Sequence, residues 1–96
     1  MSRQMRPGRA ERLALVRRCD SCLLAKLSRL DRTIVELRFG LDADGIIYTP
    51  TEVARIFRCT IYRVASLEGK AFVRLARLVE ERDRLLSAVL DEERGF

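Results

Sequence analysis

Histidine and tryptophan are absent from this chain of 96 residues, and only 6% of its residues are aromatic. Histidine is the side chain most often used for acid–base catalysis near neutral pH and for binding metals, so the commonest catalytic machinery is missing. No glycine-rich phosphate loop is present, and the carboxylates lie mostly on amphipathic helix surfaces or in a turn. We therefore expect neither enzymatic activity nor a cofactor.

Long apolar runs are also absent. No segment approaches the ~18 consecutive apolar residues that a membrane-spanning helix needs, and the N-terminus lacks the apolar core of a signal peptide. We expect a cytoplasmic protein with no membrane partner, whose thiols are reduced.

The chain has three cysteines, of which Cys19 and Cys22 form a C-x-x-C motif. With no histidine and only Cys59 besides, a zinc site would lack its fourth thiolate, and a carboxylate would have to replace it. An ordinary thiol pair is the preferred interpretation, so we predict no metal site and leave the role of the pair open.

Aliphatic residues dominate the apolar 48% of the chain, and their spacing predicts helices. We interpret residues 1–8 as a disordered basic arm and residues 9–96 as a single helical domain. The first helix is expected from Arg9 to about Leu27, with Ser28 at its end. A second helix is expected from Asp31, as N-cap, to Arg38. Its inward-facing residues are expected to be Ile34, Val35 and Leu37.

Gly40 follows the second helix at the position of a left-handed C-cap. After a loop with an Asp-Gly turn signal, Thr49 fits an N-cap, Pro50 fits the first helical position, and Glu52 fits the return partner of a capping box. This is the strongest local signal in the sequence, and it predicts a helix over 50–57. Its expected buried residues are Val53, Ile56 and Phe57.

A tight turn at Arg58 and Cys59 then leads to Thr60, which fits a second N-cap. From Ile61 onward, apolar residues recur at steps of three and four for about thirty residues without a proline. Two alternatives remain: one long helix, or a break near 80–84, where five charged residues occur in succession.

Charge is unevenly distributed along the chain. The net charge is +5 overall, whereas residues 1–32 carry nine Arg and Lys against three Asp and Glu. Residues 58–77 carry five basic residues and one acid, and residues 78–96 carry six acids and three basic residues. A basic surface favours an anionic partner such as nucleic acid.

Several runs between Leu30 and Leu75 resemble region 4 of the sigma-70 type of bacterial sigma factors. LRFGL at 37–41 resembles the family's LRFGL or LRYGL signature, and DADG at 42–45 matches its acidic-glycine loop. TPTEVARIF at 49–57 and LEGKAFVRL at 67–75 are similar to its two later helices, and Thr60 stands where the family caps its recognition helix.

The resemblance implies an all-α, helix-turn-helix domain of the winged-helix-like, sigma region 4 type, with an extra N-terminal helix and a long C-terminal helix. It also implies contact with duplex DNA at the −35 promoter element, through the helix that begins after Thr60, and with the flap of the RNA polymerase β subunit. An α-helix fits the major groove, where its N-terminal side chains reach base edges.

The chain departs from the family in two ways. In the base-contacting stretch TIYRVASLE at 60–68, only Arg63 is kept among the family's exposed base-contacting side chains, so discrimination at −35 is expected to be lost or altered. No counterpart of the family's promoter-opening region 2 is present. We therefore expect a transcription regulator or one half of a split sigma factor. The predicted DNA-binding residues are Arg58, Thr60, Ile61, Tyr62, Arg63, Ala65, Ser66, Lys70, Arg74 and Arg77.

Other interpretations remain open. The chain is alternatively a protein-interaction module that binds the β flap, or itself, through Leu37, Phe39 and Ile56 without specific DNA recognition, or a vestigial protein with neither activity. The N-terminal basic residues are either a DNA-contacting arm or a solvated tail; they are Arg3, Arg6, Arg9 and Arg12. The extension at 76–96 either folds back within the monomer, which we favour, or pairs with a second copy, so the oligomeric state is open.

Overall fold

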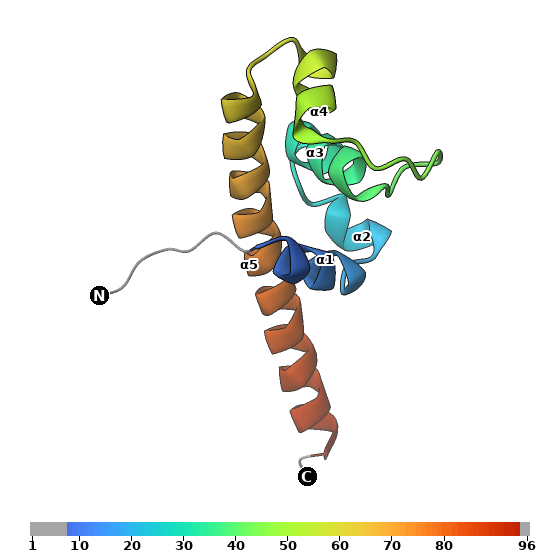
Figure 1. Cartoon of the computed structure of the whole chain (residues 1–96). Coiled ribbons are helices and arrows are strands. Elements are labelled where there is room, and N and C mark those ends of the chain that lie inside the picture. The colour runs from blue at the N-terminus through green and yellow to red at the C-terminus, as the bar shows by residue number, and fades with distance from the viewer. Residues whose placement is uncertain (1–7, 95–96) are drawn as a thin grey trace, which may run out of the picture.

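The structure is a computed structural model that describes residues 8–94, all side chains to Glu92 included (Figure 1). It contains five helices over these residues: α1 (Arg9–Arg17), α2 (Ser21–Leu24), α3 (Arg29–Phe39), α4 (Pro50–Phe57) and α5 (Ile61–Arg94). The all-α expectation is confirmed for this range, which has no β-strand. The wing of a winged-helix-like domain therefore has no counterpart there. The predicted basic arm, apart from Gly8, lies outside the described residues.

Helix α5 forms a rod along the molecule, and the other four helices pack against one side of it (Figure 1). The main core lies where α1 and α3 meet the middle of α5, and the rings of Phe39 and Phe72 pack edge-on there with centroids 5.2 Å apart. A second, smaller cluster joins α4 to the start of α5 through Val53, Ala54 and Val64. These two clusters fix the direction of α5 relative to the bundle.

The single helix predicted over 9–27 is wrong, because the chain breaks into α1 and α2. The carboxylate of Asp20 accepts a hydrogen bond from the Leu23 amide at 2.8 Å and caps α2. Val16 and Leu23 are both buried on the two sides of this break. The N-cap at Asp20 stabilises the start of the new helix, which the helical spacing of the apolar residues alone does not reveal.

The predicted N-cap of α3 is also wrong by one turn. Ser28, which we expected to end the preceding helix, caps α3 instead: its hydroxyl accepts a hydrogen bond from the Asp31 amide at 3.2 Å. Asp31 itself is only 2% exposed, and its carboxylate forms an ion pair with Arg74 on α5. The side chain is thus used for a contact between helices. Gly40 adopts the predicted left-handed conformation, with φ 66°.

Helix α4 follows its sequence signals. Thr49 caps it, the Thr49 amide donates to Glu52 Oε1 at 2.9 Å, and the bounds are those predicted. Val53 is fully buried and Phe57 half-buried, but the expected burial of Ile56 is wrong, because this side chain is 51% exposed.

Helix α5 runs without a break through the charged run at 80–84. Its last turns extend beyond the bundle (Figure 1). The expectation that the extension packs within the monomer holds for its first part, where Val79 is buried and Leu78 packs on the main core. It is wrong for the tail from Leu85 onward, whose aliphatic side chains are exposed. Polar contact between α5 and the end of α1 extends as far as Arg82 and Asp83. Arg82 donates to the Arg18 carbonyl at 2.7 Å, and Asp83 pairs with Arg18. None of the described helices combines the length and the apolar character that crossing a membrane requires.

Candidate nucleic-acid interface

The turn between α4 and α5 presents the start of α5 at one end of the molecule (Figure 1). Arg58 ends α4 in the left-handed region, with φ 55°, and the Cys59 amide donates to the Ala54 carbonyl at 3.0 Å. The hydroxyl of Thr60 then accepts from the Arg63 amide at 3.1 Å, so the predicted second N-cap is present. A change of direction within three residues is thus fixed by a backbone hydrogen bond at the end of α4 and by a side-chain cap at the start of α5.

One face of α5 is buried and the opposite face is basic. Val64, Ala71 and Leu75 are fully buried on the inner face. Arg63, Lys70 and Arg77 are exposed and recur at intervals of seven residues. Seven residues make nearly two helical turns, so these side chains lie on one line about 10 Å apart. We call Arg63, Lys70 and Arg77 the basic stripe.

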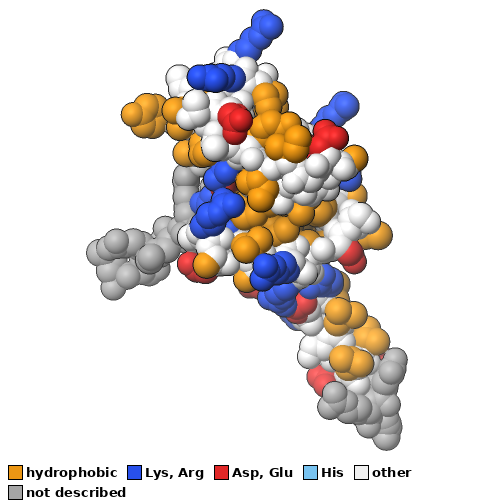
Figure 2. Space-filling model, turned by 45° about the vertical axis from the view of Figure 1, so that its right-hand side comes forward, with side chains coloured by type: hydrophobic (Ala, Val, Ile, Leu, Met, Phe, Trp, Pro, Cys, Tyr) orange, Lys and Arg blue, Asp and Glu red, His pale blue; other side chains and the backbone are white. Residues whose placement is uncertain are grey.

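The other predicted residues near the start of α5 surround the first cation of the basic stripe. Ile61 is 46% exposed, and Tyr62 is 87% exposed. Thr60 and Ala65 are exposed, and Ser66 is half-buried. Figure 2 shows basic and apolar side chains side by side at this end of the molecule. The first two turns of α5 therefore offer a mixed apolar and cationic surface to solvent.

Arg74 differs from the other predicted cations, because its guanidinium forms an ion pair with the buried carboxylate of Asp31. Its side chain is still 56% exposed, so the guanidinium pairs with Asp31 on one side and faces solvent on the other. We had assigned it to DNA alone, and the structure gives it a second role in joining α3 to α5.

Lys26 is a basic residue near this surface that the sequence analysis did not single out. It lines a shallow hollow together with Arg74, Arg77 and Leu78, next to Ser28 at the start of α3. Asp31, whose carboxylate pairs with Arg74, also lines it, so the hollow combines three cations with one buried carboxylate beside the N-terminus of α3. No local pattern marks Lys26, because the other two cations of this hollow lie some fifty residues later in the chain.

Arg12, which we considered for a DNA-contacting arm, lies inside the bundle instead. It pairs with the carboxylate of Glu68, which is 4% exposed, and it covers the ring of Phe72 at 5.2 Å. The Arg38 Nε donates to the other oxygen of Glu68 at 2.7 Å, and the Nη1 of the same guanidinium donates to the Tyr48 carbonyl at 2.8 Å. This buried network joins α1, α3, α5 and the loop before α4.

Of the remaining basic residues considered for the arm, Arg9 lies on α1 with its guanidinium 5.1 Å from the centre of the Phe39 ring. This cation–π contact stabilises the packing of α1 against α3. Arg3 and Arg6 lie outside the described residues.

The residues considered for binding the β flap do not form one surface. Phe39 is only 8% exposed and belongs to the main core, and Leu37 packs against the smaller cluster. Ile56 is exposed on α4, and the loop before α4 exposes further aliphatic side chains, which are Leu41, Ile46 and Ile47.

The cysteines show no metal-binding arrangement. Asp20 begins a new helix between Cys19 and Cys22, the Cys19 thiol donates to the Leu15 carbonyl at 3.2 Å, and Cys22 is exposed. Burial raises the pKa of the Cys19 thiol, which makes its thiolate less available. Among residues 8–94, no group of three or more metal-ligating side chains comes together.

Comparison of the chain with protein families, curated proteins and solved structures found no match.

Proposed function

We propose that this protein is a DNA-binding transcription regulator of the sigma region 4 type, acting in the cytoplasm at promoters with RNA polymerase. In this proposal α4, the turn at 58–60 and the first half of α5 form a helix-turn-helix, and α5 is the recognition helix. The observation that carries the proposal is the basic stripe, which is exposed on the half of α5 that follows a capped turn.

The geometry of duplex DNA supports this assignment. A major groove about 12 Å wide admits one α-helix, and the N-terminal side chains of that helix reach base edges. Arg63 is the cation nearest the start of α5 that faces solvent, so we assign it to base edges or to the phosphates beside them. Ile61, Tyr62 and Ala65 are suited to contact thymine methyl groups, and Ser66 offers a hydroxyl.

The cations farther along the surface are suited to the phosphate backbone. Arg58 lies at the turn, and Lys70 and Arg77 follow Arg63 along the basic stripe. Lys26 and the open side of Arg74 add to them at the hollow beside α3. Contacts to phosphate set the register of a protein on the duplex, whereas contacts to base edges select the sequence.

Binding to duplex DNA at increasing salt tests the proposal. Each phosphate contact contributes a slope of about 0.9 to the fall of log affinity with log salt. The variant Arg63→Glu is expected to weaken binding and to reduce the slope by about 1. Arg17→Glu is the matched control, because it makes the same change of charge at an exposed position on α1. Equal losses in both variants, or no binding at low salt, would contradict the proposal.

Selection of sites from random duplexes tests whether sequence is recognised. We expect enrichment of one motif by the wild-type protein and its loss with Arg63→Ala. Enrichment that survives Arg63→Ala would assign recognition to other residues.

A second candidate function is binding to the RNA polymerase β flap without DNA recognition. It is favoured by the exposure of Ile56 on α4, an apolar side chain that the sequence analysis expected to be buried. A flap fragment that is retained by the wild-type protein but not by Ile56→Glu, together with no binding to DNA, would support this function over the first.

A further inference from the structure

The end of α5 carries a row of aliphatic side chains that no described part of the chain covers. Leu85, Leu86, Val89 and Leu90 are each between 51% and 56% exposed, and we call them the apolar tail face. They lie on the part of α5 that extends beyond the bundle, at the lower end of the molecule in Figures 1 and 2. Four half-exposed aliphatic residues on consecutive turns form a patch larger than scattered surface residues do.

The apolar tail face continues the buried face of α5. At 100° per residue, these four positions share the side of the helix that Leu75 and Val79 occupy inside the bundle. The first part of this side is covered by α1 and α3, and the second part is open. The apolar side of α5 therefore continues beyond the helices of this chain that cover its first part.

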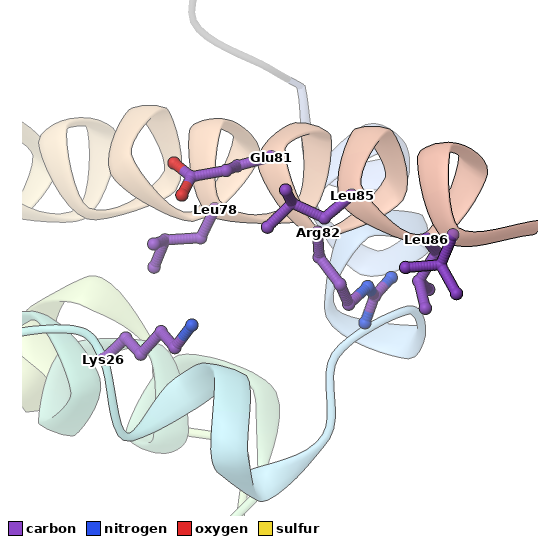
Figure 3. A pocket seen from close by; sticks show the side chains of 7 residues that line it. Lys26, Leu78, Glu81, Arg82, Leu85 and Leu86 are labelled. Carbon is purple, nitrogen blue, oxygen red and sulfur yellow. The ribbon is translucent and has the colours of Figure 1, made fainter. Parts of the chain in front are cut away.

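A pocket marks the base of the apolar tail face. Lys26, Leu78 and Arg82 line it together with Leu85 and Leu86 (Figure 3). Lys26, which follows α2, points toward α5 across this space. The pocket is apolar along α5 and has two cations at its rim, although Glu81 also contributes a carboxylate.

We propose that the apolar tail face binds the same face of a second copy of this chain, with the two helices antiparallel. About a point between Ser87 and Ala88 the face is self-complementary: Leu85 stands opposite Leu90 of the second copy, and Leu86 stands opposite Val89. A twofold axis requires this kind of match between identical surfaces.

Charge disfavours the parallel orientation. The described side chains of the tail end with Asp91 and Glu92, whereas its base carries Lys26, Arg82 and Arg84 beside Glu80, Glu81 and Asp83. In the antiparallel pair, Asp91 lies level with Arg84 of the second copy, and Glu92 lies at the level of the base that Lys26 flanks. In a parallel pair, the two acidic ends would lie together, and like charges at an interface disfavour association.

The interface is small, so the dimer is weak. Interfaces that bury less than about 1,200 Å² in total are typical of transient complexes. The dimer is therefore expected to form at high protein concentration and to dissociate on dilution, and the bundle itself remains folded in both states.

Sedimentation equilibrium over a wide range of concentration tests the proposal. The mass is expected to rise from 11.1 kDa toward twice this value, without larger species. Leu86→Glu is expected to keep the protein monomeric. Ile46→Glu is the matched control, because Ile46 is 50% exposed in the loop before α4, and it is expected to dimerise as the wild type does.

The orientation is tested by a charge swap. Lys26→Glu and Glu92→Lys are each expected to weaken the dimer, and the double variant is expected to recover it. Circular dichroism confirms that each variant is folded. A wild-type protein that stays monomeric at every concentration, a species larger than a dimer, or a Leu86→Glu variant that dimerises normally would overturn the proposal. Failure of the double variant to recover would overturn the antiparallel orientation.

Discussion

Glu68 shows how a single side chain holds the bundle together. Its two carboxylate oxygens face Arg12 of α1 and Arg38 of α3, and all three side chains are at least 84% buried. Charges removed from water are tolerated only when partners and hydrogen bonds compensate them. Because both guanidiniums pair with this one carboxylate, Glu68 links α1, α3 and α5.

Removal of this carboxylate is expected to destabilise the protein strongly. Glu68→Ala removes a buried carboxylate that two largely buried cations share, and breaking such a buried pair costs about 3–5 kcal/mol of unfolding free energy. Urea denaturation followed by circular dichroism measures this change. Glu80→Ala, on the exposed side of the same helix, is expected to change stability by less than about 0.5 kcal/mol. A small effect of Glu68→Ala would show that the arginines find water or other acceptors.

The cap of α4 predicts a dependence on pH. The backbone amide of Thr49 hydrogen-bonds to the carboxylate of Glu52 and lowers the pKa of Glu52 below its usual value of 4.5. A lowered pKa means that the carboxylate stabilises the fold above pH 4.5 and that this stabilisation is lost as pH falls through the lowered value. The difference in melting temperature between wild type and Glu52→Gln is therefore expected to shrink toward acidic pH. A difference that does not vary with pH would contradict this role.

The junction between α3 and the following loop depends on a glycine. Gly40 has φ 66°, and a Cβ added there would lie 2.8 Å from the Gly45 carbonyl oxygen, closer than real Cβ atoms come. Gly45 has the same φ but no atom within 4 Å of an added Cβ. A side chain at Gly45 would therefore introduce backbone strain alone, whereas a side chain at Gly40 would add a steric clash.

We expect Gly40→Ala to be more destabilising than Gly45→Ala. Gly45→Ala is expected to lose about 1–2 kcal/mol, the strain of a left-handed residue, and Gly40→Ala is expected to lose more because the loop must also shift. Chemical denaturation of both variants gives the comparison. Equal losses would mean that the loop moves aside at no cost.

Local sequence signals predicted the elements that depend on local hydrogen bonds. Thr49, Thr60 and Gly40 each act within four residues of their own position, and their roles were predicted correctly. The sequence analysis missed the N-cap role of Asp20 and wrongly predicted Asp31 as an N-cap. The carboxylate of an aspartate can either cap its own helix or pair with a cation on another helix. Only the path of the chain decides between the two.

The contacts that determine how much of the candidate surface is open lie far apart in sequence. The Arg74–Asp31 pair spans 43 residues and the Arg12–Glu68 pair spans 56. No helical period reveals such pairs, so the sequence analysis assigned Arg74 to DNA and placed Arg12 in either a DNA-contacting arm or a solvated tail. The basic stripe was predictable because the inner face of α5 is marked by its apolar residues, which leave Arg63, Lys70 and Arg77 on the other side.

For the whole molecule, the end of α5 is expected to contribute little to the stability of the monomer. A chain that stops after Arg84 keeps the contacts of Arg82 and Asp83 with α1, and the residues that it loses up to Glu92 are all exposed. In dilute solution its unfolding free energy is expected to stay within about 0.5 kcal/mol of the full chain. Leu75→Ala, in the core, is expected to cost about 2–5 kcal/mol. A large loss on truncation would mean that the tail packs on the bundle in solution.

Continuity of α5 has a consequence for anything that binds at its two ends. Because 34 residues form one unbroken helix, its two ends keep a fixed angular phase about a common axis. One residue inserted between Arg77 and Leu85 would rotate the distal end by about 100° relative to Arg63, whereas seven would return it to nearly the same azimuth about 10 Å farther away. If a ligand at the start of α5 changes the affinity for a ligand at its end through the helix, this change is expected to vary periodically with the length of the insertion. If the two ligands bind independently, insertions are expected to have no such periodic effect.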